Sequence, residues 1–203
     1  MLVKNPELSR LESMNELHLD DSFIAAQKDT QTVNPDGDLL EKNIHGVKIF
    51  NPVTHVDNRG RLFEILPGKN DFWSDPVVYC YAFTIKVNTG KGWGLHQKKI
   101  DRYTLITGEI LSVLFDARLN SPTHGLIQKV FMSGQRFRQL LIPAGVWHMN
   151  LNIGPEEAFL INHPTQIYNH QAPDRLLLDW NTKEIPIDLQ QFFPIQIPIG
   201  EVE

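Results

Sequence analysis

A series of short runs rich in β-branched and aromatic residues constrains this fold more than any other feature of the sequence. The runs are VKIFNPV, VVYCYAFTIKV, RYTLITGEI, LSVLFDA, IQKVFMS, RQLLIPA and AFLIN. Turn-forming residues separate them at short intervals, which is typical of a sandwich or barrel of antiparallel strands. Helical periodicity is weak between Val47 and Ile187, and proline residues fall near the ends of the runs, where they do not interrupt central strand pairing. The sequence therefore predicts an all-β core.

The order of the segments predicts one domain with a leading arm and a short tail. A chain of 203 residues with 41% hydrophobic and 21% charged residues suits a single globular core. Leucines at loosely helical spacing before residue 28 predict a helical or partly ordered arm, which a turn signal at residues 34–37 follows. We expect an arm over residues 1–42, a barrel over residues 43–190 and an extended, proline-spaced tail over residues 191–203.

Charge and composition exclude several classes of function. The formal net charge is −5, and the Lys and Arg residues are scattered, which argues against nucleic-acid binding. A few local cations can still hold a phosphorylated ligand. Cys80 is the only cysteine, so an intrachain disulfide and a thiolate zinc cluster are excluded. Because the first residues lack a signal-peptide pattern and no stretch is long and apolar enough to span a bilayer, we expect a cytoplasmic protein with no membrane partner.

Two segments carry histidines in positions suited to chemistry. One contains Gly94-Leu95-His96, and the other, Ile142–Asn150, has proline and glycine in a tight turn that aims His148 into a barrel interior. The second segment, completed by Asn152, matches the second motif of the cupins. A metal-binding cupin would also have a pair of histidines and a glutamate in its first motif, where only His96 is present. Since a catalytic metal usually needs three protein ligands, we expect no metal and no other cofactor.

Together with two further segments, these motifs resemble a known family of enzymes. The segments are Val56–Glu64, which holds D-x-R-G-x-x-F-E, and Phe115–Gly125, which holds D-x-R-x-x-S-P-T-x-G. In this order the motifs resemble dTDP-4-dehydrorhamnose 3,5-epimerase and its relatives, over about residues 47–186. The resemblance implies a cupin-type antiparallel β-barrel, or jelly roll, in a homodimer. It also implies an epimerase that binds a nucleotide-linked 4-keto-6-deoxy sugar, removes a proton beside the ketone and returns one to the opposite face.

The resemblance assigns roles to four residues by their motif positions. His96 matches the catalytic base, while Arg59, Glu64 and His148 match residues of the sugar-nucleotide pocket. Each also has a structural interpretation. His96 can be a hydrogen-bonded histidine on a barrel wall, Arg59 can form a surface salt bridge, and His148 can serve packing and hydrogen bonding.

The chain departs from the family at three positions. Ile161 stands where the family has its catalytic tyrosine, so we expect Tyr168 to supply the acid, ahead of Tyr103. Asp101 stands where the family has a lysine, and Lys98 or Lys99 can supply the missing cation. Trp93 stands where an arginine is common, and offers either a stacking face for the substrate or a packed core residue. Asn162, beside Ile161, completes the expected substrate-binding residues.

These departures leave three functions open. The first is an epimerase of a nucleotide-linked keto sugar that acts at one carbon or at two. The second is a non-catalytic sugar-nucleotide-binding cupin that has lost its acid. The third and least favoured is a metal-dependent cupin, with a third ligand from Glu109 or His163.

Overall fold

The computed structural model describes residues 29, 31–36, 40, 42–68 and 70–193, in two compact units, Met1–Glu41 and Lys42–Glu203. In the first unit the amide of Leu40 donates to the carbonyl of Thr32 at 2.9 Å. Most of the expected arm, and residues 194–203 of the expected tail, lie outside the described residues, so their conformations stay predictions. Among the described residues no helix is both long and apolar enough for a membrane span.

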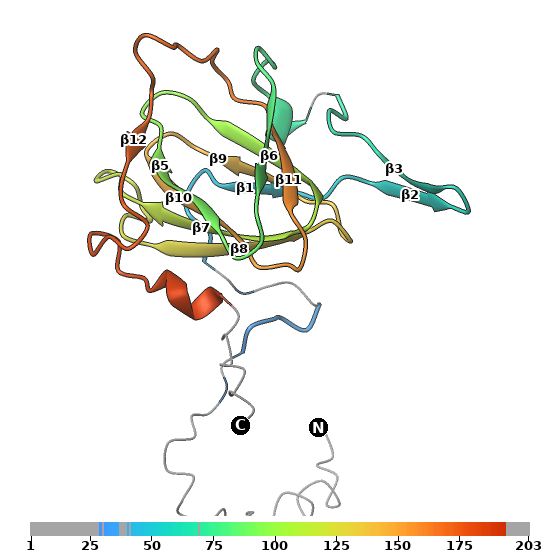
Figure 1. Cartoon of the computed structure of the whole chain (residues 1–203), viewed down its shortest axis with the longest axis horizontal. Helices are drawn as coiled ribbons and strands as arrows, with labels where there is room; N and C mark the ends of the chain where they lie inside the picture. The colour runs from blue at the N-terminus through green and yellow to red at the C-terminus, as the bar shows by residue number, and fades with distance from the viewer. Residues whose placement is uncertain (1–28, 30, 37–39, 41, 69, 194–203) are drawn as a thin grey trace, which may run out of the picture. The chain divides into compact units, whose positions relative to one another are not determined.

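The second unit is built from two five-stranded antiparallel sheets and a separate hairpin (Figure 1). The first sheet has the order β1 (Lys48–Phe50), β9 (Gln139–Ile142), β6 (Asp101–Thr107), β11 (Ala158–Asn162), β4 (Tyr81–Ile85). The second has the order β12 (Leu176–Leu177), β5 (Gly90–Leu95), β10 (Val146–Asn152), β7 (Glu109–Asp116), β8 (Ile127–Ser133). The hairpin pairs β2 (Thr54–Asp57) with β3 (Gly60–Phe63), and two short 3-10 helices are η2 (Asp71–Trp73) and η3 (Leu189–Phe192). The predicted all-β jelly-roll class is confirmed.

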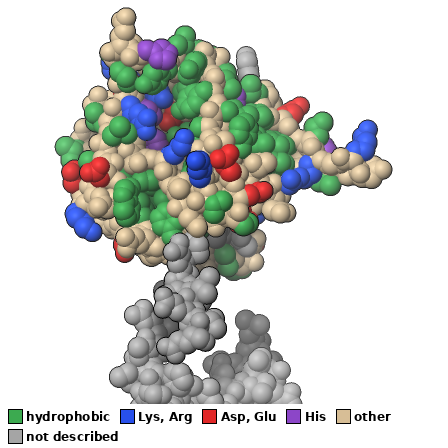
Figure 2. Space-filling view, in the orientation of Figure 1, with side chains coloured by type: hydrophobic (Ala, Val, Ile, Leu, Met, Phe, Trp, Pro, Cys, Tyr) green, Lys and Arg blue, Asp and Glu red, His purple; other side chains and the backbone are tan. Residues whose placement is uncertain are grey.

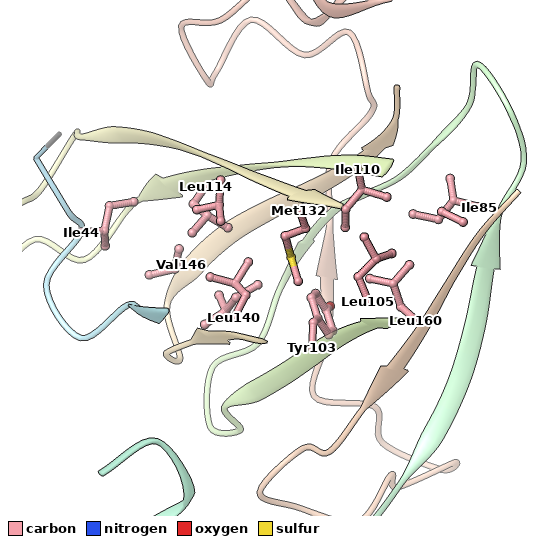
Figure 3. Packing of buried hydrophobic residues seen from close by; sticks show 13 residues of the cluster. Ile44, Ile85, Tyr103, Leu105, Ile110, Leu114, Met132, Leu140, Val146 and Leu160 are labelled. Carbon is pink, nitrogen blue, oxygen red and sulfur yellow. The ribbon is translucent and has the colours of Figure 1, made fainter. Parts of the chain in front are cut away.

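The two sheets pack face to face through a shared hydrophobic core (Figure 3). Alternate residues of a strand point to opposite faces, so Leu105 of β6 and Leu160 of β11 meet Ile110 and Leu114 of β7 between the sheets. All four side chains are fully buried. Burial of such a side chain stabilises the fold by roughly 1.5–3 kcal/mol.

The second sheet is covered on its outer face as well. Leu111 and Val113 of β7 pack there with Trp93, and η3 adds Leu189 to the same cluster. Both faces of β7 are therefore buried, which explains why its sequence is a nearly continuous apolar run instead of an alternating one.

The segment after β7 shows what the D-x-R-x-x-S-P-T motif does in this fold. The buried carboxylate of Asp116 accepts hydrogen bonds from Arg118, from the Ser121 hydroxyl at 2.6 Å and from the Thr123 hydroxyl at 2.7 Å. Burial would raise the pKa of Asp116, but these hydrogen bonds outweigh it and hold the pKa well below its usual range. The motif is thus a structural turn at one end of the second sheet.

Candidate functional site

A cavity of about 470 Å³ opens between the two sheets, within the range of roughly 300–1,000 Å³ that holds small ligands. On the face shown in Figure 2, Lys, Arg and His side chains gather around a hollow. The cavity is lined by Tyr79, Tyr81, Phe83, Lys91, Gly92, Gly94, His96, Lys99, Tyr103, His148, Asn150, Tyr168, His170 and Arg175.

Two histidines and one carboxylate converge beside this cavity. His96 directly follows β5, Asp101 begins β6, and His148 lies in β10 opposite Gly94. The Oδ2 atom of Asp101 is 3.2 Å from Nε2 of His96 and 3.7 Å from Nε2 of His148. All three residues are buried, and the imidazoles line the cavity while Asp101 lies behind them.

Backbone carbonyls define the tautomers of both histidines. Nδ1 of His96 contacts the carbonyl oxygen of Asp174, and Nδ1 of His148 is 3.2 Å from the carbonyl oxygen of Val146. Because a carbonyl oxygen only accepts, both Nδ1 atoms carry the hydrogen. In each neutral ring Nε2 is then an acceptor, so three acceptor atoms meet beside the cavity, and one positive charge would satisfy them all.

Several neighbours hold Asp101 in its ionised form. The Tyr103 hydroxyl donates to Oδ2 at 3.3 Å, the Asn162 amide donates to Oδ1 at 2.9 Å, and Nζ of Lys99 is 3.5 Å from Oδ1. Burial alone would raise the pKa of Asp101. A hydrogen bond from His96 when its ring is protonated, together with the charges of the protonated imidazoles and of the Lys99 ammonium, lowers this pKa well below its usual range.

Burial determines the protonation states of two further cavity residues, His148 and Tyr81. Burial lowers the pKa of His148 to about 4, so its imidazole is neutral at pH 7. Burial, assisted by the charge of Asp101, raises the pKa of Tyr81 to about 12. Since the Asn162 amide donates to the Tyr81 oxygen at 2.9 Å, the protonated Tyr81 hydroxyl can still donate into the cavity.

A single carboxylate fixes the loop that carries His96. Asp174 accepts hydrogen bonds from the amides of Gln97 at 3.0 Å, Lys98 at 2.9 Å and Lys99 at 3.1 Å. Burial acts to raise the pKa of Asp174, but these backbone hydrogen bonds lower it below its usual range. The side chain and the carbonyl of Asp174 therefore hold both the loop and the His96 ring.

The structure brings five of the expected site residues together. His96, His148, Lys99 and Tyr168 line the cavity, and the Tyr168 ring packs edge-on to His170 with 4.8 Å between centroids. Asn162 does not line the cavity itself, but it is fully buried and its amide donates to Asp101.

The other four expected residues lie outside this cavity. Trp93 is packed in the hydrophobic cluster on the outer face of the second sheet, which corresponds to the structural interpretation of that residue. Lys98 is exposed on the loop after His96. Arg59 is paired with Asp57 at 2.5 Å on the exposed hairpin, and Glu64 is exposed directly after it. None of these four side chains lines the cavity of its own chain.

Sequence reasoning missed several contributors to the site, including Tyr81 and Lys91 on the cavity wall as well as Asp101, Asp174 and Arg175. The motif comparison marks Asp101 only as the replacement of a lysine, although it lies two positions before Tyr103 on one face of β6, which is a detectable signal. Asp174 and Arg175 follow a stretch with no strand periodicity, and no local pattern marks them.

Comparison with known proteins identifies the same family that the sequence motifs predict. Residues 41–199 match the family model described as dTDP-4-dehydrorhamnose 3,5-epimerase. The chain is 32% identical over 153 residues to the probable low-salt glycan biosynthesis epimerase Agl13 of Haloferax volcanii, covering 70% of this chain and 97% of that protein.

Solved structures share the fold at lower sequence identity. A dTDP sugar isomerase of Desulfovibrio desulfuricans superimposes with a TM-score of 0.66 at 20% identity, covering 71% of this chain and 91% of the other. The dTDP-6-deoxy-D-glucose-3,5-epimerase of Legionella pneumophila, solved with dTDP-4-keto-L-rhamnose, gives a TM-score of 0.63 at 23% identity, covering 72% and 80%.

Proposed function

The chain belongs to the dTDP-4-dehydrorhamnose 3,5-epimerase family, and we propose that it acts as a nucleotide-sugar epimerase whose cavity binds a nucleotide-linked 4-keto-6-deoxy sugar. We propose further that His96 removes the proton from the carbon beside the ketone. The ketone makes this carbon acidic, so the step needs a positioned base, an acid on the opposite face and a positive group near the enolate oxygen.

One observation supports the assignment of the base. His96 lines the cavity, and the ionised Asp101 lies 3.2 Å from its Nε2 atom. The carboxylate would stabilise the imidazolium that forms when the His96 ring turns toward the sugar and takes its proton. His148 is a pocket residue beside it, and its neutral ring can accept a hydrogen bond from the sugar.

The remaining roles go to other cavity residues. Lys99 places a buried ammonium at the cavity wall, which suits the enolate oxygen. Tyr168, which also lines the cavity, is the proposed acid. Lys91 and Arg175 supply cations for the diphosphate, since charge-assisted hydrogen bonds to phosphate are among the strong ones.

We also propose a homodimer. The β2–β3 hairpin extends away from the sheets (Figure 1) and exposes Val56 at 71% and Leu62 at 63% of their surface. A second copy would cover these side chains and pair open strand edges. In such a dimer Arg59 and Glu64 would serve the partner's cavity. A cytoplasmic location stays a prediction from the sequence.

Solvent isotope exchange tests the proposed chemistry. Chelator-treated protein is incubated in deuterated water with a panel of nucleotide-linked 4-keto sugars, and NMR follows deuterium at C3 and C5. We expect incorporation that His96→Asn abolishes and that His124→Asn, an exposed histidine outside the cavity, leaves unchanged. Deuterium at one carbon identifies single-site epimerisation, and deuterium at both identifies the double reaction.

A non-catalytic binding protein is the second candidate, favoured by Ile161 at the family's tyrosine position. It predicts that nucleotide sugars bind, as measured by calorimetry, while no sugar of the panel takes up deuterium. Tyr168→Phe separates the two functions further, because only an enzyme would lose inversion while retaining exchange by His96.

A further inference from the structure

We propose that His96, Asp101 and His148 form a binding site for one divalent transition-metal cation, of the class of Zn²⁺ or Co²⁺. The sequence alone predicted no metal because it offered only two histidine ligands. Asp101 provides the third ligand, at the position where the family has a lysine. This site does not depend on the proposed function.

The separations of the three ligand atoms fit a metal. Zinc lies about 2.0–2.2 Å from imidazole nitrogen and carboxylate oxygen, so neighbouring ligands of a tetrahedral site are about 3.4 Å apart. Oδ2 of Asp101 is 3.2 Å from Nε2 of His96 and 3.7 Å from Nε2 of His148. All three atoms lie within 4.8 Å of one another. Small side-chain rotations are therefore enough to enclose an ion.

The surroundings of the two histidines resemble those of metal ligands. A metal-binding histidine usually donates its second ring N–H to a carbonyl or carboxylate, which fixes the tautomer and orients the ring. Here the carbonyls of Asp174 and Val146 contact the Nδ1 atoms of His96 and His148. Both Nε2 lone pairs are thereby directed to the same carboxylate oxygen, and a cation between them would turn three opposed acceptors into ligands.

The ligand chemistry selects the class of metal. Two imidazoles and one carboxylate suit zinc and its first-row neighbours, whereas magnesium and calcium prefer sites made of oxygen. The nearby ammonium of Lys99 lies 3.5 Å from Oδ1, and Asn162 donates to that same oxygen. The positive charge of Lys99 lowers the affinity for a cation. Both contacts are made to Oδ1, and at Oδ2 a metal would share the oxygen with the Tyr103 hydroxyl, which donates to it at 3.3 Å. The cavity gives access to the remaining coordination positions.

Metal binding has a consequence for His96 that does rest on the proposed function. The Nε2 lone pair that binds a metal cannot also accept a proton from the sugar. Metal and proton therefore compete for one nitrogen, and we expect the metal-loaded protein to lose base-catalysed exchange while the chelator-treated protein retains it.

Cobalt titration tests the site. Co²⁺ is added to the chelator-treated full chain and followed by visible d–d absorption and by calorimetry, with one equivalent expected to bind. Loss of a supporting residue around a metal ligand costs about 10–100-fold in affinity, so loss of a ligand in Asp101→Asn or His148→Asn should cost at least about 100-fold. Asp101→His, which restores a ligand atom, should recover binding, and His124→Asn should bind like the unmodified chain.

Binding that survives in both Asp101→Asn and His148→Asn, or no binding by the unmodified chain, would overturn the site. If Asp101→Asn does not fold, as judged by near-ultraviolet circular dichroism, His148→Asn and the Co²⁺-induced rise in Tm of the unmodified chain decide the matter. A chain that binds Co²⁺ but shows no exchange without metal would overturn the proposed function alone. If bound Co²⁺ leaves the exchange unaffected, then His96 is either not a metal ligand or not the base. A Co²⁺ titration of His96→Asn distinguishes these two cases, because full binding by this variant would mean that His96 is not a ligand.

Discussion

Asp101 and Asp116 are both buried carboxylates, yet they have different kinds of partners. Asp116 is fully satisfied by the turn that it organises, with donors from Arg118, Ser121 and Thr123. Asp101 instead shares Oδ2 with two imidazole nitrogens that are acceptors in their neutral form. Asp101 also has donors, from Tyr103 and Asn162, but these leave the two neutral imidazole nitrogens beside it without one, so the cluster can still take up a proton or a metal ion.

The stability due to Asp116 should depend on pH. Its pKa is lowered in the folded chain, so its contribution is complete above the unfolded pKa of about 3.9 and is lost as the pH falls toward the folded value. We expect Asp116→Asn to lower the free energy of unfolding by about 1.5–3 kcal/mol at pH 7, the range for hydrogen bonds to a charged group. Urea unfolding measures this difference.

The same comparison at lower pH supplies the control. Below pH 4 the difference between the unmodified chain and Asp116→Asn should shrink, while the exposed Asp179→Asn should show little difference at any pH. A difference that stays constant down to pH 3 would contradict an ionic origin.

At the scale of elements, the position of His96 depends on a loop held by one residue from the far end of the chain. Asp174, just before β12, binds three consecutive amides after β5. We expect Asp174→Ala to lower kcat by at least about tenfold, because displacement of a catalytic group by about 1 Å can cost a hundredfold, with a smaller effect on KM. Steady-state kinetics on the best sugar of the exchange panel measures both constants.

Asp174→Asn is the matched variant, since its single amide oxygen can replace Oδ2 as acceptor for Lys98 and Lys99, while the acceptor for Gln97 is lost. It should retain part of the activity that Asp174→Ala loses. Equal losses in the two variants would mean that two of the three hydrogen bonds are not enough to hold the loop.

Local sequence predicted the strands far better than the connections between them. The runs RYTLITGEI and LSVLFDA became β6 and β7, but the break falls at Gly108, inside the first run. Gly108 has φ +85, and a Cβ there would lie 2.7 Å from Cα of Ala158, so only glycine allows this turn. The run VVYCYAFTIKV became a strand only over Tyr81–Ile85.

The site was predictable only in part, for a related reason. His96 and His148 belong to motifs with fixed spacing, so the sequence identified them. Asp174 and Arg175 come from a segment without periodic pattern, and their positions depend on contacts with residues about 75 positions earlier. Such contacts are a property of the folded chain and leave no local signal.

At the scale of the whole molecule, the exposed hairpin bears on assembly. Val56 and Leu62 are more than half exposed, although the hairpin is anchored at its base, where Phe63 stacks on Phe137 with 3.5 Å between ring centroids. We expect the unmodified chain to sediment as a dimer and the double variant Val56→Asp, Leu62→Asp to sediment as a monomer, because buried carboxylates would be costly. Analytical ultracentrifugation measures both.

A double variant at Leu119 and Ile167, two other exposed apolar residues away from the hairpin, serves as the control and should remain dimeric when both are changed to Asp. A monomeric unmodified chain would contradict the proposed dimer, and a dimeric hairpin variant would place the interface elsewhere.

Strand β5 carries glycine at three alternate positions, which are Gly90, Gly92 and Gly94. A Cβ at Gly92 would lie 2.5 Å from the carbonyl oxygen of His148, so this position allows β5 and β10 to approach each other. A Cβ at Gly94 would make ordinary contact, 3.4 Å from Nε2 of His148 and 3.7 Å from Nε of Arg175. One added methyl group at position 94 would thus occupy room beside these two nitrogens without replacing any polar group of the cavity. The space left for a ligand at this point is therefore determined by a residue that has no side chain.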